Sequence, residues 1–171
     1  KYDDVMGPST DGHALSRFNV PPGRNGEHPM TYTKEAIEAV TFVRDAIHSP
    51  QDVRHFMDIG HPAYTVTATI NGKEIARSNR ALKVKEVGRG VYDPVLYFVR
   101  EDVDMSALEA TDKTTHCPLK GDTTYFDLNL DGSQQQDAAW SYTQTIDDAG
   151  VLKDLIAFDN TCVQIVEHTA S

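Results

Sequence analysis

The step Asn71-Gly72 lies between two runs of alternating residues, and it constrains the fold of this chain more than any other feature. From Tyr64 to Ile70 apolar residues alternate with threonines, and a second run extends from Lys73 to Ser78. Alternation with a period of two is typical of a half-buried strand, and Asn-Gly favours the positive backbone angles of a two-residue turn. The sequence therefore predicts an antiparallel β-hairpin at this position.

Further short apolar runs follow, each bounded by turn residues. They predict strands over residues 81–87, 95–99, 120–130, 135–142, 155–158 and 162–167. Asp131-Gly132 is expected to join the two long strands, a last hairpin is expected around Asp159-Asn160, and residues 101–108 are expected to form a turn of helix. Because tight turns join neighbours in antiparallel sheets, we predict a mainly β domain over residues 62–171.

The residues before this domain follow a different pattern. Residues 1–30 are rich in Gly and Pro, so we expect an extended arm, either a disordered tail or a segment that packs on a partner subunit. Residues 31–61 predict a two-helix extension. Apolar residues recur at helical spacing over 33–48, and Ser49-Pro50 offers a cap and a first helical residue for a second helix that ends at Gly60.

The charge of the chain narrows the classes of partner. Its net charge is −10 and its isoelectric point is near 5.0, so it repels phosphate backbones and anionic membranes, and we expect neither nucleic acid nor membrane as a partner. No apolar run approaches the length of a membrane span. Two cysteines make no disulfide framework, and Asn-x-Ser/Thr is absent, so the expected location is cytoplasmic.

A set of aromatic and charged residues predicts a pocket in the β domain. Trp140 and Tyr142 share one face of a strand, and Tyr125 lies on the strand expected to pair with it. These aromatics either fill the core or form the wall of an apolar pocket. Glu86 takes an inward position in "ALKVKEV", where a carboxylate needs a cationic partner.

Arg77, Arg80 and Lys120 are the candidate partners of this carboxylate. The predicted ligand-binding residues are therefore Arg80, Glu86, Lys120, Tyr125, Trp140 and Tyr142. The expected ligand is a small anionic or polar molecule, because Lys120 beside Arg80 makes an anion-binding pair.

Cys117 in "TTHCPLKGDTTYF" is the candidate for a catalytic residue. A nucleophilic cysteine must be a thiolate, and His116 and Lys120 are close enough in sequence to favour one. The alternative is a small buried residue at the entry of a strand. Two cysteines cannot make a pair of Cys-x-x-Cys zinc knuckles, and the spacing His55-x-x-Asp58-x-x-His61 is interrupted by Gly60, so no metal and no cofactor are predicted.

Several separated motifs resemble one family. "NGKEIARSNRALKVKE", "TDKTTHCPLKGDTTYF", "DAAWSY" and "LIAF" occur in the order and spacing of the domain of unknown function numbered 427, which also carries a nucleotidyltransferase label. The resemblance implies coiled antiparallel sheets of the β-tent type, here with an N-terminal helical extension, and implies no function. Nucleotidyl transfer needs carboxylates that hold Mg²⁺, and Glu101, Asp102 and Asp104 lie on what is predicted to be an exposed turn.

Three functions remain open at this point, in the following order. The first is a small-ligand-binding or enzymatic β domain with the aromatic and charged pocket. The second is a non-catalytic interaction module that forms a homodimer through the N-terminal extension. The third is a thiol-redox protein that uses Cys117 and requires Cys162 within its reach. The sequence does not identify a ligand or a reaction.

Overall fold

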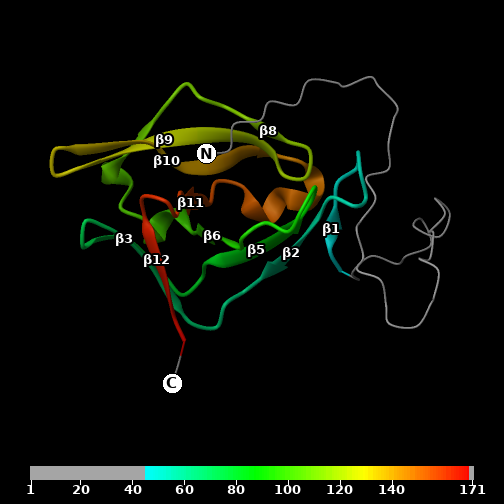
Figure 1. Cartoon of the computed structure of the whole chain (residues 1–171), viewed down its shortest axis with the longest axis horizontal. Coiled ribbons are helices and arrows are strands. Elements are labelled where there is room, and N and C mark those ends of the chain that lie inside the picture. The colour runs from blue at the N-terminus through cyan, green and yellow to red at the C-terminus, as the bar shows by residue number, and fades with distance from the viewer. Residues whose placement is uncertain (1–44, 170–171) are drawn as a thin grey trace, which may run out of the picture. The chain divides into compact units, whose positions relative to one another are not determined.

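The computed structural model describes residues 45–169 (Figure 1). The predicted arm, and the part of the first predicted helix that precedes residue 45, lie outside the described residues. Within residues 45–169, no helix has the length and hydropathy needed to cross a bilayer.

The described residues are mainly β. The strands are β1 (Ile47–His48), β2 (Phe56–Gly60), β3 (Thr65–Ile70), β4 (Lys73–Ser78), β5 (Leu82–Val87), β6 (Val95–Phe98), β7 (Leu108–Ala110), β8 (His116–Cys117), β9 (Gly121–Leu130), β10 (Ser133–Thr145), β11 (Ile156–Phe158) and β12 (Gln164–His168). Three short 3₁₀ helices join some of them: η1 (Arg100–Asp102), η2 (Met105–Ala107) and η3 (Asp147–Leu152). The predicted turn of helix over 101–108 is confirmed as η1 and η2.

The strands form two antiparallel sheets. The larger has the order β1-β2-β5-β6-β11-β10-β9-β7, with β8 added beside β9, and the smaller has the order β12-β3-β4. In Figure 1 the long β9–β10 hairpin extends beyond the rest of the sheet, while β3 and β12 lie side by side in the smaller one. The prediction of a mainly β fold with antiparallel sheets is confirmed.

Both predicted two-residue turns are present. Asn71 and Gly72 have φ of 50° and 78°, and Asp131 and Gly132 have φ of 50° and 81°. These left-handed angles are those that Asn, Asp and Gly adopt most readily, which explains the local choice of residues. The first turn joins β3 to β4 and the second joins β9 to β10.

The second predicted helix is wrong. Residues 49–55 form turns, and residues Phe56–Gly60 form β2, which pairs with β5 from Phe56 opposite Val87 to Gly60 opposite Lys83. Ser49 does begin a turn, since its Oγ accepts a hydrogen bond from the Gln51 N–H, but no helix follows it. Pairing with β5 outweighs the weak local preference for a helix. The large sheet consequently begins before the predicted boundary at residue 62.

The expected last hairpin around Asp159-Asn160 is also wrong. β11 pairs with β10 and β6 in the large sheet, whereas β12 pairs with β3 in the small one. The turn at Asp159 therefore carries the chain from one sheet to the other. Buried Val163 follows this turn, and the change of sheet places it in the core between the sheets.

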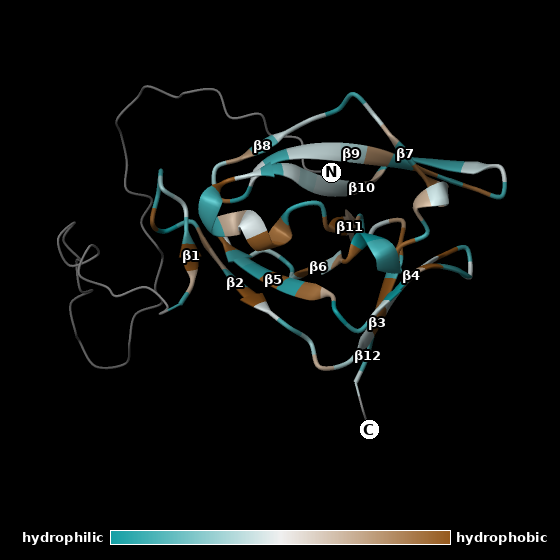
Figure 2. Cartoon of the chain, turned by 180° about the vertical axis from the view of Figure 1, so that it is seen from behind, coloured by the Kyte–Doolittle hydropathy of each residue, from teal (hydrophilic) through white to brown (hydrophobic). Residues whose placement is uncertain are grey.

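The two faces of the large sheet bury different apolar clusters. Leu96 and Phe98 of β6 belong to an inter-sheet cluster, which also contains residues of β3 and β4. Tyr97, between them, points to the opposite face and belongs to a second cluster with Leu119 and Leu152. Figure 2 shows hydrophobic residues along β3 and both hydrophilic and hydrophobic residues along β5. The candidate site lies at the edge of this second cluster, hereafter the site-side cluster.

Candidate functional site

The turn between β8 and β9 places two functional side chains on the site-side cluster. The Lys120 N–H donates a hydrogen bond of 3.2 Å to the Cys117 carbonyl, which closes the turn through Pro118 and Leu119. Leu119 is fully buried and anchors the turn in the cluster. Lys120 is 6% exposed, so the turn directs an ammonium group into the protein.

Gly121 follows this lysine because only glycine fits there. Its φ is +117°, and a Cβ at this position would lie 2.1 Å from the Gln144 carbonyl oxygen. The close approach lets the Lys120 carbonyl accept a hydrogen bond of 3.1 Å from the Ile146 N–H at the start of η3. Gly121 thus allows two backbone segments to lie in close contact, and this contact holds Lys120 in place.

Glu86 on β5 is bound from two sides. One carboxylate oxygen pairs with the Lys120 ammonium, and the other lies 2.6 Å from the Nε2 atom of His55. The side chains of Glu86 and His55 are 15% and 19% exposed. The expectation that the inward carboxylate has a cationic partner is confirmed, and that partner is Lys120.

The ion pair keeps both of its members charged. Burial opposes the ionised form of Glu86, but the Lys120 charge and the His55 hydrogen bond outweigh it, and the pKa of Glu86 lies below its ordinary value. Burial likewise opposes the charge on Lys120, yet the nearby anionic and phenolic groups, Glu86 among them, hold its pKa above the ordinary value. Glu86 is therefore a carboxylate at neutral pH and can only accept hydrogen bonds.

His55 is held in position by the loop between β1 and β2. The His55 carbonyl accepts a hydrogen bond of 2.8 Å from the Ser49 N–H, and Ser49 Oγ donates one of 3.2 Å to the Pro118 carbonyl. The second bond fastens the histidine loop to the turn that carries Cys117. On its other side, the His55 ring packs against Gly88, where an added Cβ would lie 3.2 Å from His55 Cδ2.

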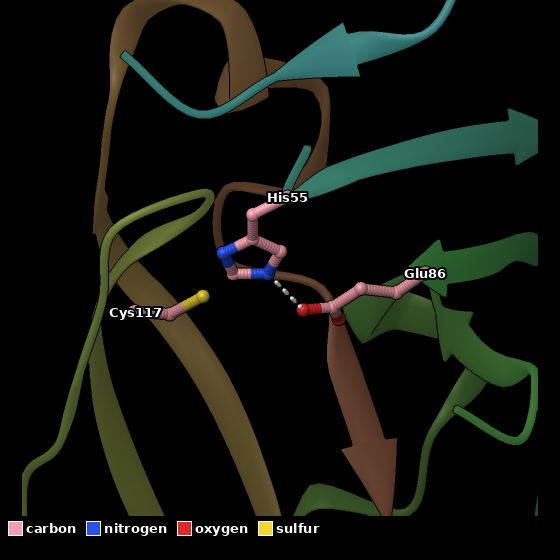
Figure 3. A group of neighbouring side chains, drawn as sticks. All are labelled: His55, Glu86 and Cys117. Carbon is pink, nitrogen blue, oxygen red and sulfur yellow. Dashed lines mark hydrogen bonds and ion pairs between the residues drawn. The ribbon is translucent and has the colours of Figure 1, made fainter. Parts of the chain in front are cut away.

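Cys117 lies beside His55. Potential ligand atoms of His55, Glu86 and Cys117 all lie within 4.8 Å of one another. Figure 3 shows that the ring nitrogen not bonded to Glu86 faces the side on which the Cys117 sulfur lies. The cysteine is partly exposed, whereas Lys120 beneath it is buried. We call these four residues, His55, Glu86, Cys117 and Lys120, the thiol–imidazole cluster.

Aromatic rings form the apolar side of this cluster. The Lys120 ammonium lies 5.7 Å from the centre of the Tyr142 ring, which is 6.3 Å from the ring of Tyr97. Trp140 packs against the same cluster as Tyr97. Burial raises the pKa of Tyr142 well above its ordinary value, so its phenol is neutral. Five sequence-predicted residues meet at this place: Glu86, Cys117, Lys120, Trp140 and Tyr142.

Two other predicted residues lie apart from the cluster's charged groups. Arg80 donates a hydrogen bond of 2.6 Å to Asp102, which also accepts one from Ser78, so its charge is used in a separate network. Tyr125 is opposite Trp140 in the β9–β10 register, but its hydroxyl contacts Thr115 and its ring lies under Lys113. The expected anion-binding pair of Arg80 with Lys120 is therefore replaced by the pair of Arg80 with Asp102.

The carboxylates considered for Mg²⁺ have structural partners. Asp102 pairs with Arg80, and Asp104 accepts hydrogen bonds from the backbone and the hydroxyl of Ser106 at the start of η2. These bonds use the two side chains to fix the short helices. The arrangement gives no support to nucleotidyl transfer at this turn.

The second cysteine belongs to another part of the protein. Cys162 packs against the inter-sheet cluster and its Sγ donates to the Asp159 carbonyl, whereas Cys117 packs against the site-side cluster. Both thiols are free. This separation does not favour a redox pair between the two cysteines.

A metal ion bound by all three residues would disturb the bonds that Glu86 already makes in the cluster. Cys, His and Glu are all zinc ligands, and their atoms lie close enough together to be considered. However, His55 Nε2 and one Glu86 oxygen bond to each other, and the Lys120 ammonium holds the second oxygen. A cation would compete with that ammonium for the same carboxylate, so the arrangement fits proton transfer better than metal binding.

A shallow polar hollow of about 480 Å³ lies elsewhere, beside β8 and the neighbouring parts of β9 and β10. It is lined by residues 111–116 and 122–124 together with Thr143 and Gln144. None of the predicted site residues lines it. The cluster itself is a partly exposed group of side chains over a packed aromatic floor.

His55 is the residue of this cluster that sequence reasoning misses. The sequence pattern groups it only with Asp58 and His61 on a predicted helix, but Asp58 and His61 are both exposed in the structure. The signal in the sequence that could have pointed to His55 is Glu86, because each of the two oxygens of an inward carboxylate can accept a hydrogen bond from a separate donor. The separation of 31 positions between His55 and Glu86 hides the pair.

A family model described as a domain of unknown function, DUF427, matches residues 58–169. The match contains Glu86, Cys117 and Lys120 and begins just after His55. No curated protein matches the chain.

Proposed function

The chain belongs to the DUF427 family, and within it we propose that this protein is a small-ligand-binding or enzymatic domain centred on the thiol–imidazole cluster. The observation that carries the proposal is the ion pair between Glu86 and the buried Lys120, with His55 bonded to the same carboxylate. These groups come from three separate segments of the chain.

The energetics of this arrangement support a functional role. Removing two charges from water costs several kcal/mol per ion, roughly, and a buried ion pair is often no more stabilising than apolar residues of the same size. Charged groups with shifted pKa values gather at functional sites more often than elsewhere. A buried lysine on an aromatic floor, opposite a carboxylate, is thus a costly structure that function explains better than stability.

The ligand chemistry follows from the free hydrogen-bonding capacity of the cluster. An ammonium group has three donors, and within residues 45–169 the hydrogen bond that the Lys120 ammonium makes is the one to Glu86. His55 Nδ1 and the Cys117 thiol provide further polar atoms at the partly exposed side. The site therefore suits a small polar or anionic molecule that presents a carbonyl or carboxylate oxygen.

Fragment binding followed by NMR tests the proposal. A set of small amides and carboxylates is titrated into ¹⁵N-labelled protein, and the expected shifts centre on His55, Glu86 and residues 117–120. Lys120→Met is expected to abolish them. The matched control is Lys83→Met, which removes another Lys–Glu pair, with Glu167, away from the cluster. Binding that survives Lys120→Met, or that maps only to other residues, would overturn the proposal.

Two finer assignments accompany this proposal. The β-tent architecture stays a prediction from the family resemblance, which the two antiparallel sheets are consistent with. A homodimer through residues 31–61 stays a prediction as well, since residues 31–44 lie outside the described range and no partner chain is present.

A further inference from the structure

We propose that Cys117 is a nucleophile toward activated acyl groups, with His55 as its general base and Glu86 as the residue that positions the base. This inference rests on the proposed function, because it names the chemistry of the same site. It is carried by three relationships: Lys120 pairs with Glu86, Glu86 bonds to His55, and His55 lies beside Cys117.

The first step of the argument concerns the tautomer of His55. Lys120 keeps Glu86 ionised, and an ionised carboxylate accepts hydrogen bonds but cannot donate them. The 2.6 Å contact therefore requires that His55 donate from Nε2. A neutral imidazole has one N–H, so its Nδ1 then carries a lone pair, and this nitrogen faces the side of Cys117 (Figure 3).

The second step concerns the distance between base and thiol. One ring nitrogen of His55 lies within 4.8 Å of the Cys117 sulfur, and the structure shows no hydrogen bond between these two residues. Nucleophile and base are often farther apart without substrate than they are during the reaction. A triad needs a nucleophile, a base and a group that orients the base, and these three residues meet that description.

The third step concerns the role of Lys120. The Lys120 ammonium pairs with Glu86 and holds it in the ionised form that fixes the imidazole. Lys120 therefore acts on the thiol through Glu86 and His55, and the proton of Cys117 passes to His55 as the thiol attacks.

The reaction then proceeds without any redox partner. His55 Nδ1 takes the thiol proton as Cys117 Sγ attacks the carbonyl carbon of an activated acyl donor, an ester or a thioester. The bond from that carbon to the leaving group breaks, and the leaving group departs with the proton from His55. Water, deprotonated by the same nitrogen, next attacks the acyl–cysteine, and this releases the carboxylic acid and restores the thiol.

The experiment uses p-nitrophenyl acetate as the acyl donor and the wild-type chain in EDTA. We expect a burst of p-nitrophenol, and an acetyl group on the peptide that contains Cys117 but not on that with Cys162. His55→Asn is expected to lower the burst rate by about a hundredfold. Glu86→Gln is expected to lower the burst rate by a smaller factor, roughly tenfold. It is also expected to change the pH profile of the burst, because the amide can bond either tautomer of the imidazole.

Several outcomes would overturn the inference. Acetylation of Cys162 at the same rate as Cys117 shows an ordinary thiol, and an unchanged burst in folded His55→Asn excludes a base role. Should that variant not fold, an unchanged pH profile in Glu86→Gln also excludes a base that Glu86 positions. Loss of the burst in EDTA, with return on adding Zn²⁺, would show a metal site. If fragments still bind the cluster while Cys117 is inert, this inference alone fails and the proposed function stands.

Discussion

The hydroxyl of Ser49 donates a hydrogen bond of 3.2 Å to the carbonyl of Pro118, which lies 69 positions later in the chain. Ser49 is 1% exposed, and its N–H bonds to the His55 carbonyl at the other end of the same loop. One serine therefore joins the loop that carries His55 to the turn that carries Cys117. The thiol–imidazole cluster depends on this join between two distant parts of the sequence.

Ser49→Ala tests the importance of the join. We expect a loss of about 1–2 kcal/mol in the free energy of unfolding, because the Pro118 carbonyl and the Gln51 N–H both lose a partner. We also expect slower alkylation of Cys117. Urea denaturation and alkylation rates measure the two effects.

The matched control for this variant is Ser78→Ala. Ser78 is also buried, at 2% exposed, and bonds to Asp102 away from the cluster. It should lose comparable stability and leave the reactivity of Cys117 unchanged. If the alkylation of Cys117 is slowed equally in both variants, the slowing comes from the loss of stability and not from the loss of the Ser49–Pro118 bond.

Removal of Lys120 tests the electrostatic role of the ion pair. Lys120→Met leaves the Glu86 charge with only His55 as partner, so we expect a cost of about 3 kcal/mol, the lower end for a broken buried pair. Glu86→Leu added to this variant is expected to restore part of that stability. Urea denaturation of the single and double variants gives the coupling between them.

Lys83→Met is the control for this prediction. Its partner Glu167 and Lys83 itself are 31% and 25% exposed, so solvent screens the pair and the expected cost is below about 1 kcal/mol. If Lys120→Met lowers the free energy of unfolding no more than Lys83→Met does, burial gives the Lys120–Glu86 pair no greater effect on stability than that of a more exposed pair.

The fold is predictable wherever the determining interactions are local. Asn71-Gly72 and Asp131-Gly132 specify their turns within two residues, and the alternation on either side specifies the strands. Phe56–Gly60 is not predictable in this way, because the pattern there fits a helix as well as a strand. Its pairing with Leu82–Val87 decides between them, and that partner is far away in the sequence.

The same distinction applies to the site. Glu86 and Lys120 are predictable as partners, since an inward carboxylate requires a cation and few are available. His55 is not, because its place beside Glu86 depends on the β2–β5 pairing and on the bond from Ser49. The expected pairing of Arg80 with Lys120 is not found, for a related reason. Asp102 follows it by 22 positions and takes its charge.

The pH dependence of stability is expected to reflect Glu86. Its pKa in the folded protein is below the ordinary value of 4.5, so the ionised form stabilises the fold above about pH 4.5. This contribution is lost as the pH falls through the lower, folded pKa. Lys120 has a raised pKa, so its contribution is present below 10.5 and is lost as the pH rises through the higher, folded value.

Thermal unfolding of wild type and Glu86→Gln over this range measures the effect. Wild type should lose more stability than the variant between about pH 5 and pH 3, because only wild type has the carboxylate to protonate. Parallel curves for the two proteins on the acid side would show that Glu86 titrates alike in both the folded and the unfolded chain.

Gly121→Ala tests the backbone contact behind the Lys-Gly step. The new Cβ would lie 2.1 Å from the Gln144 carbonyl oxygen, and φ is +117°, so we expect a loss above about 3 kcal/mol. Gly72→Ala is the control. It has φ of +78° with nothing within 4 Å of the new atom, and should cost only about 1–2 kcal/mol. Similar losses, measured by urea denaturation, would show that the contact with Gln144 relaxes.

The alkylation rate of Cys117 as a function of pH tests the central claim most directly. Wild-type protein is treated with iodoacetamide from pH 5 to pH 9, and the two cysteine peptides are quantified separately, with Cys162 as the internal standard. An ordinary thiol has a pKa of about 8.5 and loses reactivity tenfold per pH unit below it. We predict that Cys162, whose pKa is raised by burial, reacts more slowly than free glutathione, and that Cys117 reacts at least tenfold faster than glutathione near pH 6. Parallel declines of the two thiols, or a Cys117 that reacts only after unfolding in urea, would contradict the account.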